Sequence, residues 1–157
     1  IKADFEINFK KFDTYQINCT YYSALGEDDN KYLISRAVQF FTPGIPQVYY
    51  VGLFAGKNDF ELYHKTEQHR DINRHYYSLD EIKTEFERPV VQKMNRLMKF
   101  RNTHPAFDGQ FMLLNSDDHS LHIRWEKDVE YTELYVDFET FKWNIIYSEN
   151  GEEKMFI

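Results

Sequence analysis

The sequence predicts an α/β segment followed by an all-β segment, and three observations support this division. Up to about residue 105, apolar side chains recur with a period near 3.6 residues, as they do on amphipathic helices. The run Gln47–Val51 is apolar on successive positions instead, which is typical of a strand buried on both faces of a parallel sheet. After Gly109 the period changes to two, which indicates antiparallel strands with one solvated face.

The first helix is expected to begin at Asp28 or Asp29, since either side chain can accept hydrogen bonds from free N–H groups at a helix start. Thr42, Pro43 and Gly44 then stop this helix. The helical period predicts that its buried face consists of Leu33, Ile34, Ala37, Val38 and Phe41.

Two start signals indicate further helical structure after residue 77. Ser78 and Glu81 match a capping box, in which the hydroxyl and the carboxylate satisfy free backbone donors. Pro89 suits the first turn of a helix, which must end before Pro105. The apolar stripe of this helix is expected to be Val90, Val91, Met94, Leu97, Met98 and Arg101.

Residues 56–77 show no clear period and are expected to form a loop at the C-terminal end of the buried strand. A loop of this length is usually functional or disordered, and its aromatic residues argue against disorder. In barrel and doubly wound folds, ligands bind at this end of the strands. A salt-bridged loop without a binding role explains the charged residues equally well. The candidates in this loop are His64, His69, Arg70, Arg74, His75, Tyr76 and Tyr77.

The segment after Gly109 is expected to form a small antiparallel sheet. Glu149, Asn150 and Gly151 are a hairpin turn signal. The alternating apolar residues that mark its strands are Leu121, Ile123 and Trp125, then Leu134, Val136 and Phe138, then Trp143, Ile145 and Tyr147.

Composition excludes some classes of function. The chain has 157 residues, of which 42% are hydrophobic and 29% charged, as in a globular protein of one domain, or one domain and a smaller second one. A formal net charge of −7 disfavours binding to a nucleic-acid backbone. The single cysteine, Cys19, excludes an internal disulfide and is interpreted as a small buried thiol. The six histidines lack metal-binding spacing, and no targeting segment is recognisable at the start. The first residue is not Met, which indicates a piece of a longer protein.

Several short sequence stretches resemble those of a known family, and they occur in the same order and without large gaps. DTYQIN, HRDINRHYYS, ERPVV and RNTHPAF, together with the run from Gln39 to Asp59, resemble the C-terminal third of the sucrose phosphorylase family in the α-amylase superfamily. The resemblance covers about Asp13 to Phe107 and implies the C-terminal part of a (β/α)8 barrel followed by an antiparallel β domain.

The resemblance also implies a division of the chain into three parts. Residues 1–26 would end an insertion over the barrel mouth, residues 27–107 would be the C-terminal portion of the catalytic barrel, and residues 108–157 would form the β domain. Within the barrel, Gln47–Val51 would be the eighth strand and residues 89–103 the eighth helix.

Four residues match substrate-binding positions of the family. Arg70 matches an arginine that grips glucose hydroxyls, and a planar guanidinium suits paired oxygen acceptors. Tyr15 and Gln16 match loop residues that meet the fructosyl group or the incoming phosphate, and Asp13 matches an aspartate of the same loop. The resemblance places the catalytic carboxylates before residue 1, so no catalytic residue is expected in this chain. Phe12, Thr14 and Cys19 depart from the family pattern, and the first two leave the acceptor open.

The function implied by the resemblance is transfer of glucose from sucrose to inorganic phosphate with retention, which gives glucose 1-phosphate and fructose. The resemblance implies no metal or organic cofactor, a cytoplasmic location, and an inactive chain when it is separated from the missing carboxylates. A phosphorylase of sucrose 6-phosphate or of a glucosylglycerate is a close alternative. A non-catalytic binding or structural role, including homodimerisation through exposed sheet edges, is the alternative from another class.

Overall fold

The computed structural model describes residues 17–156, which divide into two compact units. Among these residues, unit 1 comprises 17–32 and Val48–Gln92, and unit 2 comprises Leu33–Gln47 and 93–156. Two helices cross this division, α3 (Asp29–Phe41) and α7 (Pro89–Thr103). The compact units therefore do not test the three-part division at residues 26 and 107, which remains a prediction.

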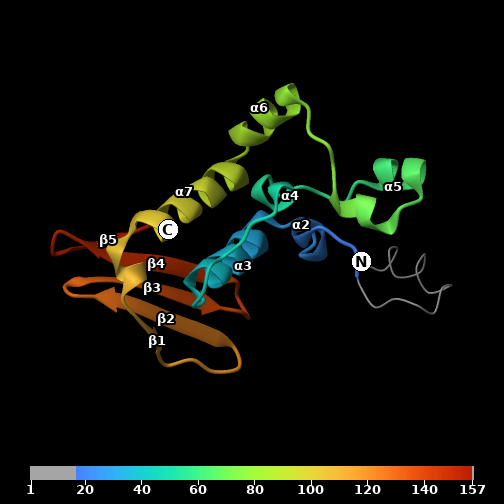
Figure 1. Ribbon diagram of the computed structural model, residues 1–157. Coiled ribbons are helices and arrows are strands. Elements are labelled where there is room, and N and C mark those ends of the chain that lie inside the picture. Colours follow the sequence, from blue (N-terminus) through green and yellow to red (C-terminus); the bar gives the residue numbers. More distant parts are fainter. Residues whose placement is uncertain (1–16, 157) are drawn as a thin grey trace. The chain divides into compact units, whose positions relative to one another are not determined.

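Unit 2 contains a five-stranded antiparallel sheet whose strands are adjacent in chain order (Figure 1). Short tight connections suffice for such a meander, since each strand pairs with the next one along the chain. The strands are β1 (Gln110–Leu113), β2 (Ser120–Lys127), β3 (Glu130–Asp137), β4 (Lys142–Glu149) and β5 (Glu152–Met155). A short 3-10 helix, η2 (Pro105–Asp108), precedes β1.

The register of this sheet confirms the alternating pattern of the sequence. Ile123 of β2 is paired with Leu134 of β3, which is paired in turn with Ile145 of β4, and all three are buried. The same face of β2 carries Trp125, whose indole N–H donates to the carbonyl oxygen of Phe41 at 2.7 Å. Phe138 differs from the expectation, because it follows the end of β3 and is exposed.

The turn between β4 and β5 confirms the hairpin signal at Asn150 and Gly151. Both residues have positive φ, 56° and 80°, which is the conformation that a two-residue type I′ turn requires. Asparagine and glycine adopt this conformation at the lowest cost.

The helix boundaries confirm the start and stop signals in the sequence. Asp28 accepts a hydrogen bond from the backbone N–H of Lys31 and so caps α3, which ends at Phe41 before the Thr42–Gly44 turn. The capping box of Ser78 and Glu81 begins α6 (Leu79–Glu87). The following helix, α7, starts at Pro89 and ends at Thr103.

Unit 1 is mostly helical, and its segment at Gln47–Val51 corrects one expectation. Tyr49 is extended, but helix α4 (Tyr50–Leu53) begins directly after it and the residues before it have no regular structure, so the expected eighth strand is not formed. A strand exists only when a neighbour hydrogen-bonds to its backbone, and within residues 17–156 no segment pairs with Gln47–Val51. The apolar run alone could not reveal this, since it says nothing about partners.

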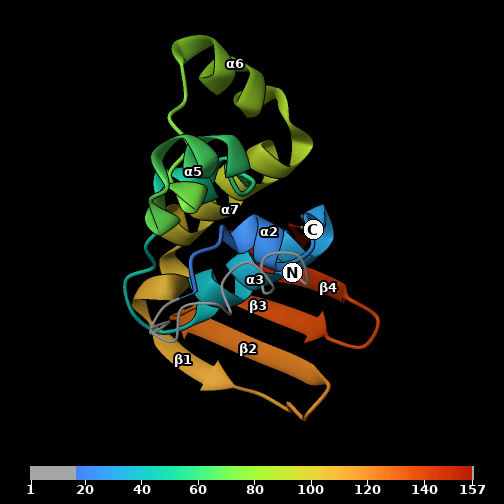
Figure 2. The ribbon, with the colours of Figure 1, turned by 90° about the vertical axis from the view of Figure 1, so that its right-hand side faces the viewer.

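The segment 56–77 is also more regular than the loop expected from its sequence. It contains helix α5 (Phe60–Thr66) and the 3-10 helix η1 (His69–Asn73), and α5 is labelled in both ribbon views (Figures 1 and 2). In the described part of unit 1, a further helix is α2 (Tyr21–Ala24). None of the helices in the described part of the chain is both long enough and apolar enough to cross a membrane.

Candidate functional site

The part of unit 1 that carries Arg70 is closed at its base by Asp59. The backbone N–H of Asp59 donates to the carbonyl oxygen of Ile72 at 2.7 Å, so the start of α5 meets the end of η1. One carboxylate oxygen of Asp59 caps α5 by accepting from the N–H of Leu62, also at 2.7 Å. Ile72 is buried at this junction. We refer to residues 59–75 as the Arg70 segment.

His75 provides a second set of contacts that closes the Arg70 segment. Each of its ring nitrogens faces a carboxylate. Nδ1 lies 2.5 Å from Oδ2 of Asp59, and Nε2 lies 3.3 Å from Oε1 of Glu81. Glu81 is itself held by the capping box of α6, in which its other oxygen accepts from the N–H of Ser78. The backbone oxygen of His75 also accepts a hydrogen bond from the hydroxyl of Tyr50 at 2.9 Å. His75 thus connects the Arg70 segment to α4 and α6.

The electrostatics favour the charged form of His75. Partial burial opposes that charge, but the hydrogen bonds and the charges of Asp59 and then Glu81 outweigh it, and the pKa of His75 is raised. Burial acts against the charge of Asp59 in the same way, yet the Leu62 N–H and His75 lower the pKa of Asp59. The pKa of Glu81 is lowered, first by the backbone N–H and hydroxyl of Ser78 and then by His75. The three groups form one network of complementary charge.

A groove of about 620 Å³ lies beside this network. One wall contains Tyr77, whose ring lies 4.6 Å from that of His75, and burial followed by the charge of Glu85 raises the pKa of Tyr77 to about 12. Opposite charges line its far end, where Arg88 pairs with Glu85 and donates to the carbonyl oxygen of Phe54. The groove is lined by residues 56–62, Lys65, His75, Tyr76, Tyr77, Glu85 and Arg88.

At the edge of this groove, position 56 has room for glycine but not for a residue with a side chain. A Cβ atom at position 56 would lie 2.4 Å from the hydroxyl oxygen of Tyr77 and 2.6 Å from a methyl carbon of Val51. Both distances are shorter than van der Waals contact, so a side chain here would displace Tyr77 or the α4 backbone.

Asn58, next to Asp59, joins the groove to residues 19–23. Its side-chain oxygen accepts from the N–H of Thr20 at 2.7 Å, and its backbone N–H donates to the hydroxyl of Ser23 at 3.0 Å. Its amide nitrogen lies 3.4 Å from the sulfur of Cys19, which is half-buried rather than fully buried. Residues that follow Gln16 by only a few positions therefore contact Asn58, which directly precedes the Arg70 segment.

The structure locates one of the four residues expected to bind substrate. Arg70 lies in η1 with an exposed side chain, and it does not line the groove beside His75. Within the described residues, no ion pair or hydrogen bond holds its guanidinium. Asp13, Tyr15 and Gln16 lie outside the described residues. The substrate-binding roles of all four residues thus stay predictions.

Sequence analysis missed the network around His75. His75 was one candidate among several, and Glu81 was interpreted only as a helix cap. The three residues are separated by 16 and 6 positions, which matches no motif. Glu81 in a capping box six residues after a histidine was the available signal, and it is weak. The described residues include no cluster of His, Cys, Asp or Glu that could hold a metal ion.

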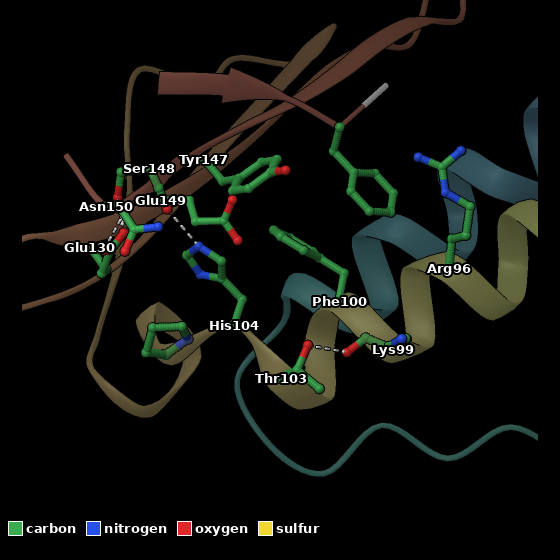
Figure 3. Close-up of a pocket in the computed structure, with 12 residues that line it drawn as sticks. Arg96, Lys99, Phe100, Thr103, His104, Glu130, Tyr147, Ser148, Glu149 and Asn150 are labelled. Carbon is green, nitrogen blue, oxygen red and sulfur yellow. Dashed lines mark hydrogen bonds between the residues drawn. The ribbon is translucent and has the colours of Figure 1, made fainter. Parts of the chain in front are cut away.

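A second groove, of about 550 Å³, lies in unit 2 and surrounds His104 (Figure 3). Nε2 of His104 donates to the backbone oxygen of Ser148 at 2.9 Å, and the rings of Phe100 and Tyr147 lie 5.0 and 5.4 Å from the imidazole. Nδ1 of His104 is buried and has no hydrogen-bond partner within residues 17–156. This groove is built mainly by packing and not by paired charges.

No family model matches the sequence. Among curated proteins, the chain is 51% identical over 147 residues to the sucrose 6(F)-phosphate phosphorylase of Thermoanaerobacterium thermosaccharolyticum, covering 93% of this chain and 30% of that protein. It is 56% identical over 122 residues to the sucrose phosphorylase of Bifidobacterium adolescentis, covering 78% of this chain and 24% of that protein.

A solved structure agrees with these relatives. The crystal structure of sucrose 6F-phosphate phosphorylase from Thermoanaerobacter thermosaccharolyticum matches with a TM-score of 0.88 at 51% identity, covering 90% of this chain and 29% of that one. The chain thus spans less than a third of the length of the curated relatives that it matches.

These relatives and the solved structure are phosphorylases of sucrose or of sucrose 6-phosphate, and the chain is similar to part of each of them. It belongs to the sucrose phosphorylase family and corresponds to a C-terminal portion of it. The match confirms the predicted fold class, a C-terminal part of a (β/α)8 barrel followed by a small antiparallel β domain.

Proposed function

We propose that this chain is part of a phosphorylase that transfers glucose from sucrose to inorganic phosphate with retention and releases glucose 1-phosphate and fructose. The observation that carries this proposal is the 56% identity to a sucrose phosphorylase over most of the chain. Sucrose, phosphate and glucose 1-phosphate are then the partners of the longer protein, with no metal or organic cofactor. A cytoplasmic location and a homodimer belong to the same proposal.

In this proposal, Arg70 holds hydroxyl groups of the transferred glucose. Two features of the structure support the role: its side chain is exposed, and no carboxylate of the described residues competes for its guanidinium. A guanidinium that is free of ion pairs can offer its planar donors to sugar oxygens.

Asp13, Tyr15 and Gln16 are proposed to contact the leaving fructosyl group or the incoming phosphate. Support comes from the contacts of Asn58 with Thr20 and Ser23, which bring the stretch just after Gln16 to the residue that directly precedes the Arg70 segment. One site could then be built from both parts of unit 1.

The chain by itself is proposed to be inactive. Retaining glucosyl transfer needs a nucleophilic carboxylate and an acid/base carboxyl about 5–5.5 Å apart. The family resemblance places both before residue 1. We expect the isolated 157-residue chain to release no glucose 1-phosphate from sucrose and phosphate, and measurable release would contradict this part of the proposal.

A phosphorylase of sucrose 6-phosphate is the second candidate. It is favoured by the relative that matches 93% of the chain and by the similar solved structure, since both carry that activity in their names. The discriminating experiment measures phosphorolysis by the full-length protein with sucrose, sucrose 6-phosphate and a glucosylglycerate as separate donors. We expect the highest kcat/KM with sucrose, and a preference for the phosphorylated donor would replace the first candidate by the second.

A further inference from the structure

Four hydrogen bonds that help to close the Arg70 segment involve Asp59, beside a ring contact of Tyr63 with His69 at 5.7 Å. Asp59 bonds to Ile72 through its backbone N–H, to Leu62 through Oδ1 and to His75 through Oδ2. Its backbone oxygen also accepts from the N–H of Tyr63 at 3.1 Å. Asp59 therefore ties the first turn of α5 to the end of η1.

His75 fixes this closed segment to the rest of unit 1. Its contacts to Glu81 and Tyr50 reach α6 and α4, two helices outside the segment. Only a doubly protonated imidazole can donate at both ring nitrogens, so two carboxylates facing one histidine form charge-assisted bonds. These bonds are stronger than those of a neutral ring, and they fix the orientation of the Arg70 segment relative to α6.

Arg70 depends on this closure for its position. Its own side chain has no ion pair or hydrogen bond within the described residues, so the backbone of η1 is what places the guanidinium. Because η1 is bonded to Asp59 at Ile72, a shift of Asp59 moves the backbone that carries Arg70.

We propose that Asp59 and His75 are positioning residues for glucose binding, acting through Arg70. This inference rests on the proposed function, since it assumes that Arg70 holds the glucose. Asp59 and His75 touch neither the sugar nor the phosphate in this proposal. Their role is to hold η1 so that Arg70 needs no reorganisation when substrate binds, which preserves binding energy for the transition state.

The test is a double-mutant cycle in the full-length phosphorylase, with kcat/KM for sucrose phosphorolysis as the readout. His75→Ala is expected to lower kcat/KM roughly tenfold, as for a loss of about 1.4 kcal/mol of transition-state stabilisation. In a protein that already carries Arg70→Lys, the same change is expected to lower it by no more than about twofold. An equal factor in both backgrounds, or no effect of His75→Ala, would overturn the proposal.

Matched variants separate positioning from general loss of structure. His64→Ala removes another histidine of the same segment, one that is exposed and has no ionic partner among the described residues, and is expected to stay within about twofold of wild type. His75→Gln keeps an amide that can donate to Asp59 and should retain more activity than His75→Ala. Should His75→Ala fail to fold, Asp59→Asn decides, because asparagine still caps α5 but removes the charge. Wild-type activity of Asp59→Asn would then overturn the proposal.

The cycle also separates this inference from the function on which it rests. If Arg70→Lys alone leaves kcat/KM unchanged, the proposed role of Arg70 is wrong and the positioning role is lost with it. If Arg70→Lys is strongly impaired while His75→Ala is not, only the positioning role is overturned.

Discussion

His75 in unit 1 and His104 in unit 2 are both half-buried, yet the chain holds their rings in opposite ways. His75 has a carboxylate at each nitrogen, from Asp59 and Glu81. His104 donates to one backbone oxygen, that of Ser148, and is otherwise surrounded by the rings of an aromatic cluster (Figure 3). One ring is held by charge and the other by packing.

This difference separates two kinds of contact. Charge-assisted bonds have a defined direction and respond to pH and salt, so they suit a contact that orients a functional segment. Aromatic packing is insensitive to both and is stronger in total area, so it suits a contact that stabilises a core. The comparison predicts that changes in the two regions affect different properties, and the following experiments test it in order of expected effect.

The largest expected effect is a loss of unfolding free energy on substitution of a core residue in unit 2. Phe100 is buried and packs against His104, Tyr147 and Phe156, with ring centroids 4.8 to 5.1 Å away. Phe100→Ala should lower the free energy of unfolding of the 157-residue chain by about 3 kcal/mol, because it leaves a cavity. Urea denaturation measures the loss. Phe138→Ala, at an exposed position, is the control, and an equal loss for both variants would contradict the aromatic-core account.

In unit 1, Gly56→Ala should have the next largest effect. The added Cβ would clash with the hydroxyl of Tyr77 and with Val51, and overpacking of this kind costs about 2 kcal/mol. The urea midpoint of the variant measures this cost. Tyr77→Phe removes the clashing oxygen, so the double variant should regain part of the loss. If the stability loss of the double variant equals the sum of the losses of Gly56→Ala and Tyr77→Phe, the predicted clash does not occur.

The two histidines themselves should differ in the next experiment. His104→Ala should lower the free energy of unfolding by about 2 kcal/mol, since it removes ring packing and leaves the Ser148 oxygen without its donor. His75→Ala should cost about 1 kcal/mol or less, because partly exposed ion pairs contribute little to stability. Urea denaturation at low and high salt measures both, and only the cost of His75→Ala should shrink with salt. The reverse order of the two losses would break the comparison.

The smallest expected effect is that of pH on the closure of the Arg70 segment. The folded pKa of His75 is raised, so its stabilising contribution is fully present below its unfolded pKa of about 6.5 and is lost as pH rises through the folded pKa. The folded pKa values of Asp59 and Glu81 are lowered, so their contribution is present above about pH 4.5 and is lost as pH falls further.

Hydrogen exchange of the amides between residues 60 and 73, corrected for the intrinsic effect of pH, measures this closure. Protection should fall as pH rises through the folded pKa of His75, while the amides of β4 stay protected. Two other titratable groups face His75, the hydroxyls of Tyr50 and Tyr77, but both have raised pKa values and stay protonated in this range. Unchanged protection of residues 60–73 between about pH 5 and pH 9 would contradict the charged form of His75.

The sequence predicted unit 2 well because its signals are local. Along each strand, apolar and polar residues alternate, and this alternation places Ile123, Leu134 and Ile145 on the buried face of the sheet. The pair Asn150–Gly151 determines the hairpin turn. Helix caps are equally local, as Asp28 and the pair Ser78 and Glu81 show. Each of these patterns lies within a few residues of the structure that it determines.

The site was harder to predict because its contacts are not local. Asp59 caps α5, Glu81 lies in α6 and His75 lies between η1 and α6, and no spacing rule links the three residues. Gln47–Val51 failed as a strand for a related reason, since its apolar pattern is right but a strand also needs a partner. Arg70 was one of several candidates in its loop, and only the family resemblance gave it a substrate-binding role, because nothing in its local sequence distinguishes a substrate-binding arginine from a surface one.

The most direct test of the central claim is sucrose phosphorolysis by the full-length protein with Arg70→Lys. The proposal predicts that kcat/KM falls roughly a hundredfold, since lysine cannot reproduce the paired planar donors, while the melting temperature stays within a few degrees of wild type. Near-wild-type release of glucose 1-phosphate by this variant would contradict the claim that the Arg70 segment handles the sugar.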